Sequence, residues 1–161
     1  MASRYPRSHK STALEPGLGN WTLKPYRRPD GSYPYQTFVK KLDPYEQRVL
    51  DAAVQVVLVR QGHNVCGTEW GTALGRGLYE FRVRQSLSAI CQEPGMVIPD
   101  GFNGDSEVLL RVFFAVEGNR IVLLLGGYDK GKDPSGRRQN REIEGARRLL
   151  KEHKTESRKK R

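Results

Sequence analysis

The alternation of apolar and polar side chains between residues 77 and 84, GLYEFRVR, predicts a half-buried β-strand. Successive side chains of a strand point to opposite faces. One face of this strand carries Tyr79, Phe81 and Val83, and the other carries Leu78, Glu80, Arg82 and Arg84. An arginine in a sheet has to reach water, a carboxylate or a phosphate, because burying it unpaired is costly. The arginine-bearing face is therefore a candidate functional surface.

Two nearly continuous apolar runs follow, at residues 108–116 and 120–126, and predict two interior strands. The Glu-Gly-Asn sequence at 117–119 predicts a tight hairpin turn between them. The first run contains Arg111, and the second leads into GGYDKGK, a glycine-rich segment that carries Lys130 and Lys132. Residues 85–107, which contain several prolines and glycines, predict an irregular insertion before the second strand.

A helix is predicted before the three strands. Asp43 is a good N-cap, Pro44 takes the first helical position, and Glu46 stands three residues after the cap. Apolar residues then recur at helical spacing to about Gln61, where Gly62 ends the helix. The stripe is broad, which favours burial of this helix against the sheet.

The remaining segments give weaker patterns. Alternating residues predict a strand over 33–42, and the glycine-rich residues 63–77 predict a loop. A modest apolar stripe predicts a last helix from Ser135 or Gly136 to His153. Residues 1–32 predict an extended or disordered basic arm, and residues 154–161 a solvated basic tail.

The predicted order is therefore strand, helix, three strands, helix. This order indicates an α+β fold with a small antiparallel or mixed sheet of about four strands flanked by helices. One domain of residues 33–153 accounts for it, between the arm and the tail.

Charge adds a candidate partner to this picture. The formal net charge of the 161 residues is +10, with about +4 in residues 1–32, −1 in 33–130 and +7 in 131–161. A basic excess of this size favours a polyanionic partner, with nucleic acid first. Charge alone leaves open the alternative that the basic ends only keep the chain soluble.

The two cysteines, Cys66 and Cys91, are too few for a disulfide framework. No apolar run is long enough to span a membrane, and no signal peptide is evident, so we expect a cytoplasmic protein that makes no membrane contact. His63, Cys66 and Cys91 are the possible metal ligands, but structural zinc usually takes four, so no metal site is predicted.

The embedded arginines suggest an anion site. If the hairpin register brings Arg111 beside Arg82, with Arg84 on the same face, three guanidinium groups crowd together, an arrangement that suits an anion between them. The alternative is that Arg82 pairs with Glu80 or a loop carboxylate, and Arg111 with Glu107 or Glu117.

These motifs resemble a known family. GLYEFRVR, LLRVFFAV, IVLLLGGYDKGKD and the helix REIEGARRLLKEH are similar, in this order, to the RelE/HigB superfamily of toxin ribonucleases, and most to its phage-derived Gp49-like HigB branch. The similarity covers residues 33–153. It leaves out the arm at 1–32, and the insertion at 85–107 is longer than the family's usual connection.

The resemblance implies a toxin of a type II toxin–antitoxin system, an endoribonuclease that cuts mRNA on the ribosome without a metal or cofactor. The RNA 2′-OH attacks the adjacent phosphate, and cations stabilise the charge that develops. By position in the motifs, the implied catalytic residues are Arg82, Arg111 and Lys130, and the implied RNA contacts are Arg84, Tyr128 and Lys132. Tyr128 would stack on a base.

The resemblance also implies a partner, an antitoxin of the helix-turn-helix, HigA-like type, that covers the cationic face. The chain departs from the family at the acid–base group, for which some relatives use a histidine or tyrosine of the last helix. His153 and His63 fit a structural role better than a catalytic one, so no residue is predicted to move the proton. The alternative function is an RNA- or ribosome-binding module without catalysis.

Overall fold

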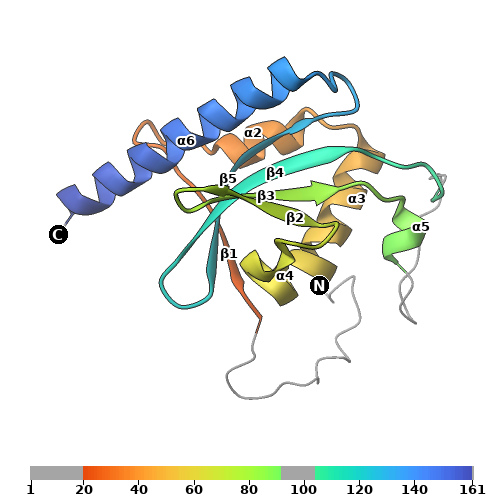
Figure 1. Cartoon of the computed structure of the whole chain (residues 1–161), viewed down its shortest axis with the longest axis horizontal. Coiled ribbons are helices and arrows are strands. Elements are labelled where there is room, and N and C mark those ends of the chain that lie inside the picture. Colours follow the sequence, from red (N-terminus) through yellow and green to blue (C-terminus); the bar gives the residue numbers. More distant parts are fainter. Residues whose placement is uncertain (1–19, 92–103, 161) are drawn as a thin grey trace.

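The computed structural model describes residues 20–91 and 104–160, which form one mixed sheet with helices on both faces (Figure 1). The strand order is β1–β5–β4–β3–β2; β1 runs parallel to β5 and the other neighbours are antiparallel. The strands are β1 (Thr22–Pro25), β2 (Gly71–Gly75), β3 (Leu78–Val83), β4 (Leu110–Glu117) and β5 (Ile121–Asp129). The helices are α2 (Pro34–Lys40), α3 (Pro44–Ala53), the π-helix η1 (Val54–Leu58), α4 (Val59–Gln61), the 3₁₀ turn η2 (Gly62–Val65), α5 (Leu87–Ile90) and α6 (Gly136–Lys159).

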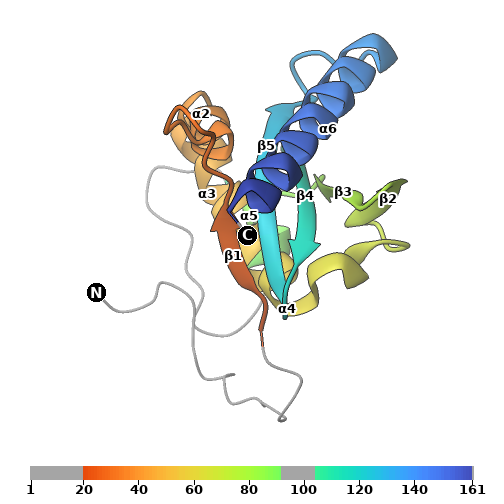
Figure 2. The same ribbon diagram turned by 90° about the vertical axis from the view of Figure 1, so that its left-hand side faces the viewer.

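The sheet has a separate apolar layer on each face. The larger layer joins α3 and η1 to side chains such as Phe81, Val112 and Phe114, which point to one face of the strands. The smaller layer joins Ala146 and Leu150 of α6 to side chains of the other face. Seen from the side, the long α6 crosses its face of the sheet, away from α3 (Figure 2). This two-sided burial explains why β4 and β5 read as nearly continuous apolar runs.

The predicted fold class is confirmed: the domain is α+β, with five strands where about four were expected. The three predicted consecutive strands are β3, β4 and β5, and the predicted first helix is the run from α3 through α4. Its capping box forms as the sequence predicts, because the Asp43 carboxylate accepts from the Glu46 N–H at 2.8 Å and Glu46 accepts from the Asp43 N–H at 3.0 Å.

The cap gives a testable stability contribution. Asp43→Ala should lower the free energy of unfolding by about 1 kcal/mol, because it leaves an N–H of the first turn without its acceptor. Chemical denaturation followed by circular dichroism measures this loss. Asp43→Asn keeps a capping oxygen and is the matched control. Equal losses in both variants would show that the carboxylate charge, and not the cap, stabilises the helix.

The strand predicted over 33–42 is wrong, because Pro34–Lys40 form the helix α2. Phe38 and Leu42 are buried, and Tyr35 and Val39 pack against the same core. These four positions have helical spacing, although Tyr35 and Val39 also fit a strand alternation, and Pro34 takes the first turn of the helix. The short segment satisfied both patterns, and packing against β5 selected the helix.

The prediction of an extended or disordered arm over residues 1–32 is wrong for residues 20–32, the part of it that the structure describes. Residues 22–25 form the edge strand β1, and the following Tyr26 is 4% exposed. The Tyr26 hydroxyl donates to Glu152 of α6 at 2.7 Å, and Arg28 donates to both oxygens of the same carboxylate at 3.1 and 3.0 Å. Residues 20–32 therefore belong to the folded domain, and residues 1–19 lie outside the described residues.

Three further boundaries differ. The predicted loop at 63–77 contains β2, which pairs with β3 across the turn Gly75–Gly77. The insertion at 85–107 contains α5, and an isolated bridge between Ser86 and Glu107 closes its base; residues 92–103 lie outside the described residues. The last helix continues to Lys159, so most of the predicted tail at 154–161 is helical.

Candidate anion-binding site

The predicted convergence of arginines occurs on the sheet face that α6 covers. Arg82 of β3 lies directly opposite Arg111 of β4, and Arg111 lies opposite Tyr128 of β5. Arg84 and Lys130 follow the ends of β3 and β5 at the same end of the sheet. We call Arg82, Arg84, Arg111 and Lys130 the cationic cluster.

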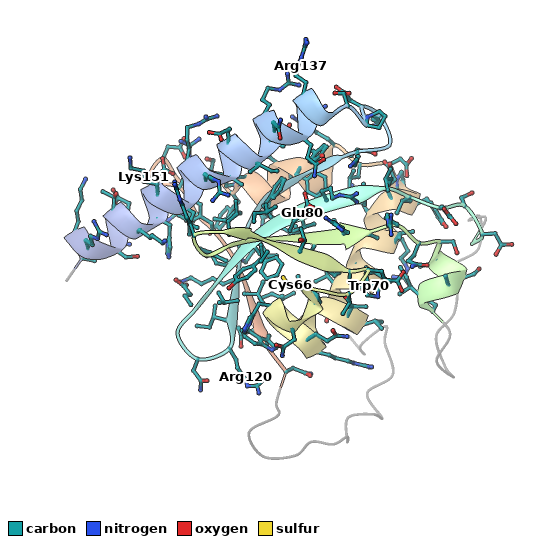
Figure 3. The ribbon with its side chains drawn as sticks, viewed as in Figure 1. Cys66, Trp70, Glu80, Arg120, Arg137 and Lys151 are labelled. Atoms are coloured by element: carbon teal, nitrogen blue, oxygen red, sulfur yellow. The ribbon has the colours of Figure 1, made fainter. Side chains whose placement is uncertain are left out.

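A buried carboxylate lies at the centre of this cluster. The Glu80 side chain has no exposed surface, and its Oε1 accepts from Arg82 Nε at 3.1 Å and lies 3.8 Å from Arg111 Nε. Its Oε2 accepts from the Gln139 amide of α6 at 3.4 Å. Figure 3 places Glu80 between the sheet and α6. The alternative pairing of Arg82 with Glu80 is therefore present. Glu80 is also the carboxylate near Arg111, for which the alternative named Glu107 or Glu117.

Arg111 is the most enclosed member of the cluster, with 5% of its surface exposed. One guanidinium nitrogen donates to the Leu110 carbonyl at 3.3 Å, and Nε has no hydrogen-bond acceptor among the described residues. Burial lowers the pKa of Arg111, and the nearby Glu80 opposes that shift. Arg111 is too enclosed to contact a large ligand directly. It lies near Glu80, which in turn accepts from Arg82.

The other cations are more accessible. The Arg82 side chain is 32% exposed, Lys130 is half-buried and Arg84 is exposed. Lys130 Nζ donates to Gln139 at 3.3 Å, and its pKa is lowered by burial and then by the nearby Arg111. Glu80 contacts Arg82 and Arg111, whereas Arg84 lines a neighbouring cavity together with Glu69, Glu107 and Asp129. The accessible cations Arg82 and Lys130 suit an anion such as a phosphate.

Tyr128 does not fit its predicted role. The side chain is 2% exposed, and its ring stacks on Phe113 at 6.1 Å between centroids. The Arg138 guanidinium lies 5.1 Å from the same ring. Phe113 and Arg138 leave no exposed face for a base, so the prediction of base stacking by Tyr128 is wrong for this structure. Its hydroxyl has no hydrogen-bond partner among the described residues.

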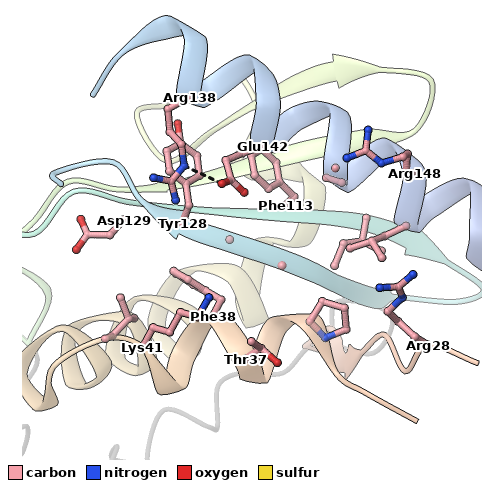
Figure 4. A pocket seen from close by; sticks show the side chains of 18 of the residues that line it. Arg28, Thr37, Phe38, Lys41, Phe113, Tyr128, Asp129, Arg138, Glu142 and Arg148 are labelled. Atoms are coloured by element: carbon pink, nitrogen blue, oxygen red, sulfur yellow. Dashed lines mark hydrogen bonds and ion pairs between the residues drawn. The ribbon is translucent and has the colours of Figure 1, made fainter. Parts of the chain in front are cut away.

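A groove of about 610 Å³ adjoins the cluster, between α2 and α6 over β5 (Figure 4). Gly126 and Gly127 of β5 line it, with Phe38 of α2, with Lys41 just after α2, and with Arg138 and Arg148 of α6. Arg138 Nε donates to Glu142 at 2.7 Å along the α6 wall. The groove combines apolar and charged side chains.

Gly127 has a steric reason to be glycine. A Cβ at this position would lie 2.4 Å from the Arg111 carbonyl oxygen and 2.6 Å from the Phe38 ring. Gly127→Ala should therefore lower the free energy of unfolding by about 1–3 kcal/mol, because strand backbone and ring both have to move. Thermal denaturation measures the loss. Gly136→Ala, where nothing lies within 4 Å of the added Cβ, is the control and should be neutral or stabilising. Wild-type stability for Gly127→Ala would contradict this close approach.

His63 and His153 lie away from the cluster. His153 Nε2 lies 2.8 Å from Glu117, at the far end of β4. Glu117 is six residues along the strand from Arg111, which corresponds to about 20 Å. The His63 ring contacts Trp21 and Tyr79. Burial raises the pKa of Cys66 and of Cys91, so both thiols are poor nucleophiles. In the described part of the chain, no three His, Cys, Asp or Glu side chains group as metal ligands.

Two residues of the site were not predicted to belong to it. Glu80 was expected only as a possible partner of Arg82, and Gln139 was not singled out at all. No periodic signal identifies Gln139, because its contact depends on how α6 docks on the sheet.

Within residues 20–91 and 104–160, no helix has the length and hydrophobicity needed to cross a membrane.

Comparison of the chain with protein-family models, curated proteins and solved structures found no match. The resemblance to RelE/HigB toxins therefore stays a prediction that rests on the strand motifs and the basic helix. The function has to be inferred from the geometry of the site itself.

Proposed function

We propose that this protein binds RNA at the cationic cluster and cleaves it as a metal-independent endoribonuclease of the RelE/HigB toxin type. The observation that carries the proposal is the cross-strand pair of Arg82 and Arg111, with Glu80 in contact with both and with Lys130 and Arg84 at the same end of the sheet. Cations that crowd on a sheet face repel one another unless an anion binds among them. An RNA phosphate supplies that anion.

In this proposal, each cation is given a role that matches its accessibility. Arg82 and Lys130, partly exposed, contact the phosphate and stabilise the negative charge that grows as the RNA 2′-OH attacks it. Arg84 and Lys132, both exposed, hold neighbouring phosphates. Arg111 holds Glu80 and thereby orients Arg82, so it is a positioning residue in this proposal.

The proposed substrate is mRNA, bound on the ribosome, and the protein acts in the cytoplasm. The proposed partner is an antitoxin of the helix-turn-helix type. Such a partner needs acidic residues to cover the cluster, because it has to offer carboxylates in place of phosphates. Binding of this antitoxin would block access of RNA to Arg82 and Lys130.

A second candidate is RNA binding without cleavage. The observation that favours it is the enclosure of Arg111 and its neutralisation by Glu80, which leave fewer cations free for a transition state. This candidate predicts RNA affinity that falls with salt while the RNA stays intact.

Controlled expression of the chain alone tests the proposal. Induction should stop growth and fragment mRNA, whereas an Arg82→Ala, Arg111→Ala form should do neither. If the wild-type protein binds RNA and leaves transcripts and growth unchanged, the second candidate stands. If it neither binds nor cleaves, both candidates fail.

A further inference from the structure

The surface of α6 that faces away from the sheet is strongly basic. The helix contains nine Lys or Arg residues against four Glu. Four of these cations are exposed at helical spacing: Arg137, Arg141, Arg148 and Lys151. At about 100° per residue they lie within an arc of about 80°. The buried Ala146 and Leu150 lie on the opposite side of the helix. We call the four cations the outer row.

The outer row is a line of positive charge along one rigid helix. From Arg137 to Lys151 the helix rises by about 21 Å, at about 1.5 Å per residue. Figure 3 shows both residues on α6, with Arg137 pointing away from the sheet. Because the helix fixes the spacing of the row, its full charge is available only to a partner that presents anions over a similar length.

The carboxylates of α6 do not neutralise the outer row. Three of the four form ion pairs with residues outside the row: Glu142, Glu152 and Glu156. Glu144 shares the exposed surface of the row. Across the part of the chain that the structure covers, no cation of the row forms an ion pair, with Glu144 or with any other carboxylate. The row therefore keeps its positive charge toward solvent.

This arrangement is unfavourable for the helix alone. Arg137 and Arg141 are four residues apart, and Arg148 and Lys151 are three apart. Like charges at these spacings repel across one turn and destabilise a helix. Arg137 also lies in the first turn, which contains no acidic residue, and the helix dipole disfavours a cation there. An anionic partner along the row relieves both effects.

The exposed side chains favour nucleic acid as this partner. Those of α6 between residues 137 and 151 are all polar: Arg137, Asn140, Arg141, Glu144, Arg148 and Lys151. A protein interface usually has an apolar centre, whereas nucleic-acid interfaces are polar and positively charged. A double helix holds its phosphates at fixed spacing, and double-helical RNA is recognised mostly through shape and backbone contacts. A rigid row of cations fits a rigid row of phosphates better than a flexible single strand.

We propose that the outer row docks double-helical RNA through its phosphates. The choice of RNA over DNA rests on the proposed function. Gln139, on the inner side of the same turns of α6, contacts Glu80 and Lys130. The row therefore lies about 10 Å from the cationic cluster, which is one helix diameter. A duplex held on the row brings the single strand next to it to Arg82 and Lys130. Phosphate contacts carry no sequence information, so the docking is independent of base sequence.

Binding of a labelled RNA hairpin over a range of salt concentrations tests the docking. Arg141→Gln, Arg148→Gln removes two cations from the middle of the row. The plot of the logarithm of the binding constant against the logarithm of the salt concentration should become shallower by about 2, because two phosphate contacts are lost. Affinity for the hairpin should fall by about tenfold or more. Lys154→Gln, Arg158→Gln removes the same charge from the last turns of α6 and should keep most of the affinity.

An unstructured RNA strand of the same length gives the contrast. Its affinity should change by less than about twofold in Arg141→Gln, Arg148→Gln, because it binds at the cluster. The docking is overturned if this variant leaves the salt dependence of hairpin binding unchanged, or if it weakens hairpin and strand alike. It is also overturned if the wild-type protein binds the hairpin no more tightly than the strand, and an acidic protein is then the better candidate for the row.

Thermal unfolding separates docking from a structural role. At low salt, the Tm of Arg141→Gln, Arg148→Gln should equal or exceed that of the wild type, because the variant removes repulsion between turns of α6. A lower Tm would show that these arginines stabilise the folded domain, which contradicts a row kept for an external anion.

The docking and the proposed cleavage fail separately. On an RNA with a hairpin next to a single strand, Arg141→Gln, Arg148→Gln should raise KM and leave kcat unchanged. If the wild-type protein cleaves this RNA and the variant cleaves it with the same KM, only the docking falls. If the wild-type protein cleaves no RNA but binds the hairpin through the row, the proposed cleavage falls and the docking stands.

Discussion

Replacing Arg82 and Lys130 together by glutamine should lower the rate of RNA cleavage by about 10²–10³-fold. Arg82 is the accessible member of the cross-strand arginine pair, Lys130 is a partly exposed cation of the same cluster, and both lose their charge in this variant. Glutamine leaves an N–H donor at position 82 for Glu80, which limits the structural damage. Initial rates on a labelled RNA, with and without ribosomes, measure the effect, and circular dichroism verifies the fold.

The matched control removes the same charge elsewhere. Lys154 and Arg158 are exposed on the last turns of α6, beside His153 and far along the sheet from Arg82. Lys154→Gln, Arg158→Gln changes the net charge equally and should keep most of the activity. If both double variants lose cleavage alike, the effect belongs to net charge and not to the cluster.

The largest expected loss of stability comes from Glu80. Glu80→Gln should lower the free energy of unfolding by about 3 kcal/mol, because it leaves Arg111 enclosed without a counter-charge. Glu142→Gln makes the same chemical change in the ion pair of Glu142 with Arg138. The two side chains of this pair are 29% and 27% exposed, respectively. That control should cost at most about 1 kcal/mol, because solvent screens the pair. Chemical denaturation of both variants measures the difference.

A double variant tests the cause of that loss. Arg111→Met added to Glu80→Gln removes the uncompensated charge, so the double variant should be more stable than Glu80→Gln alone. Additive losses would mean that Glu80 and Arg111 act independently, which contradicts the central place of Glu80 in the cluster.

The sequence predicts much of the fold and part of the site. Strand periodicity places Arg82 and Arg84 on one face, and the tight turn at 117–119 ties β4 to β5, which brings Arg111 opposite Tyr128. The capping residues locate α3 correctly. These features depend on neighbours close in the chain, which a linear pattern can reveal.

The remaining features depend on contacts between distant segments. Tyr128 is enclosed because Phe113 and Arg138 meet on its ring, and Arg138 belongs to α6. The edge strand β1 is only four residues long and has no alternation strong enough to predict it; its pairing with β5 forms it. Glu46, at the start of α3, and Asp129, at the end of β5, line one cavity. No local pattern brings these pairs together.

The chemistry of the RNA ends tests the central claim most directly. RNA incubated with the wild-type protein, with ribosomes where they are needed, should carry new 2′,3′-cyclic phosphate and 5′-OH ends, and the Arg82→Gln, Lys130→Gln protein should produce about 10²–10³-fold fewer. Intact RNA with the wild-type protein, or equal numbers of new ends with both proteins, would contradict the claim that the cationic cluster acts on an RNA phosphate.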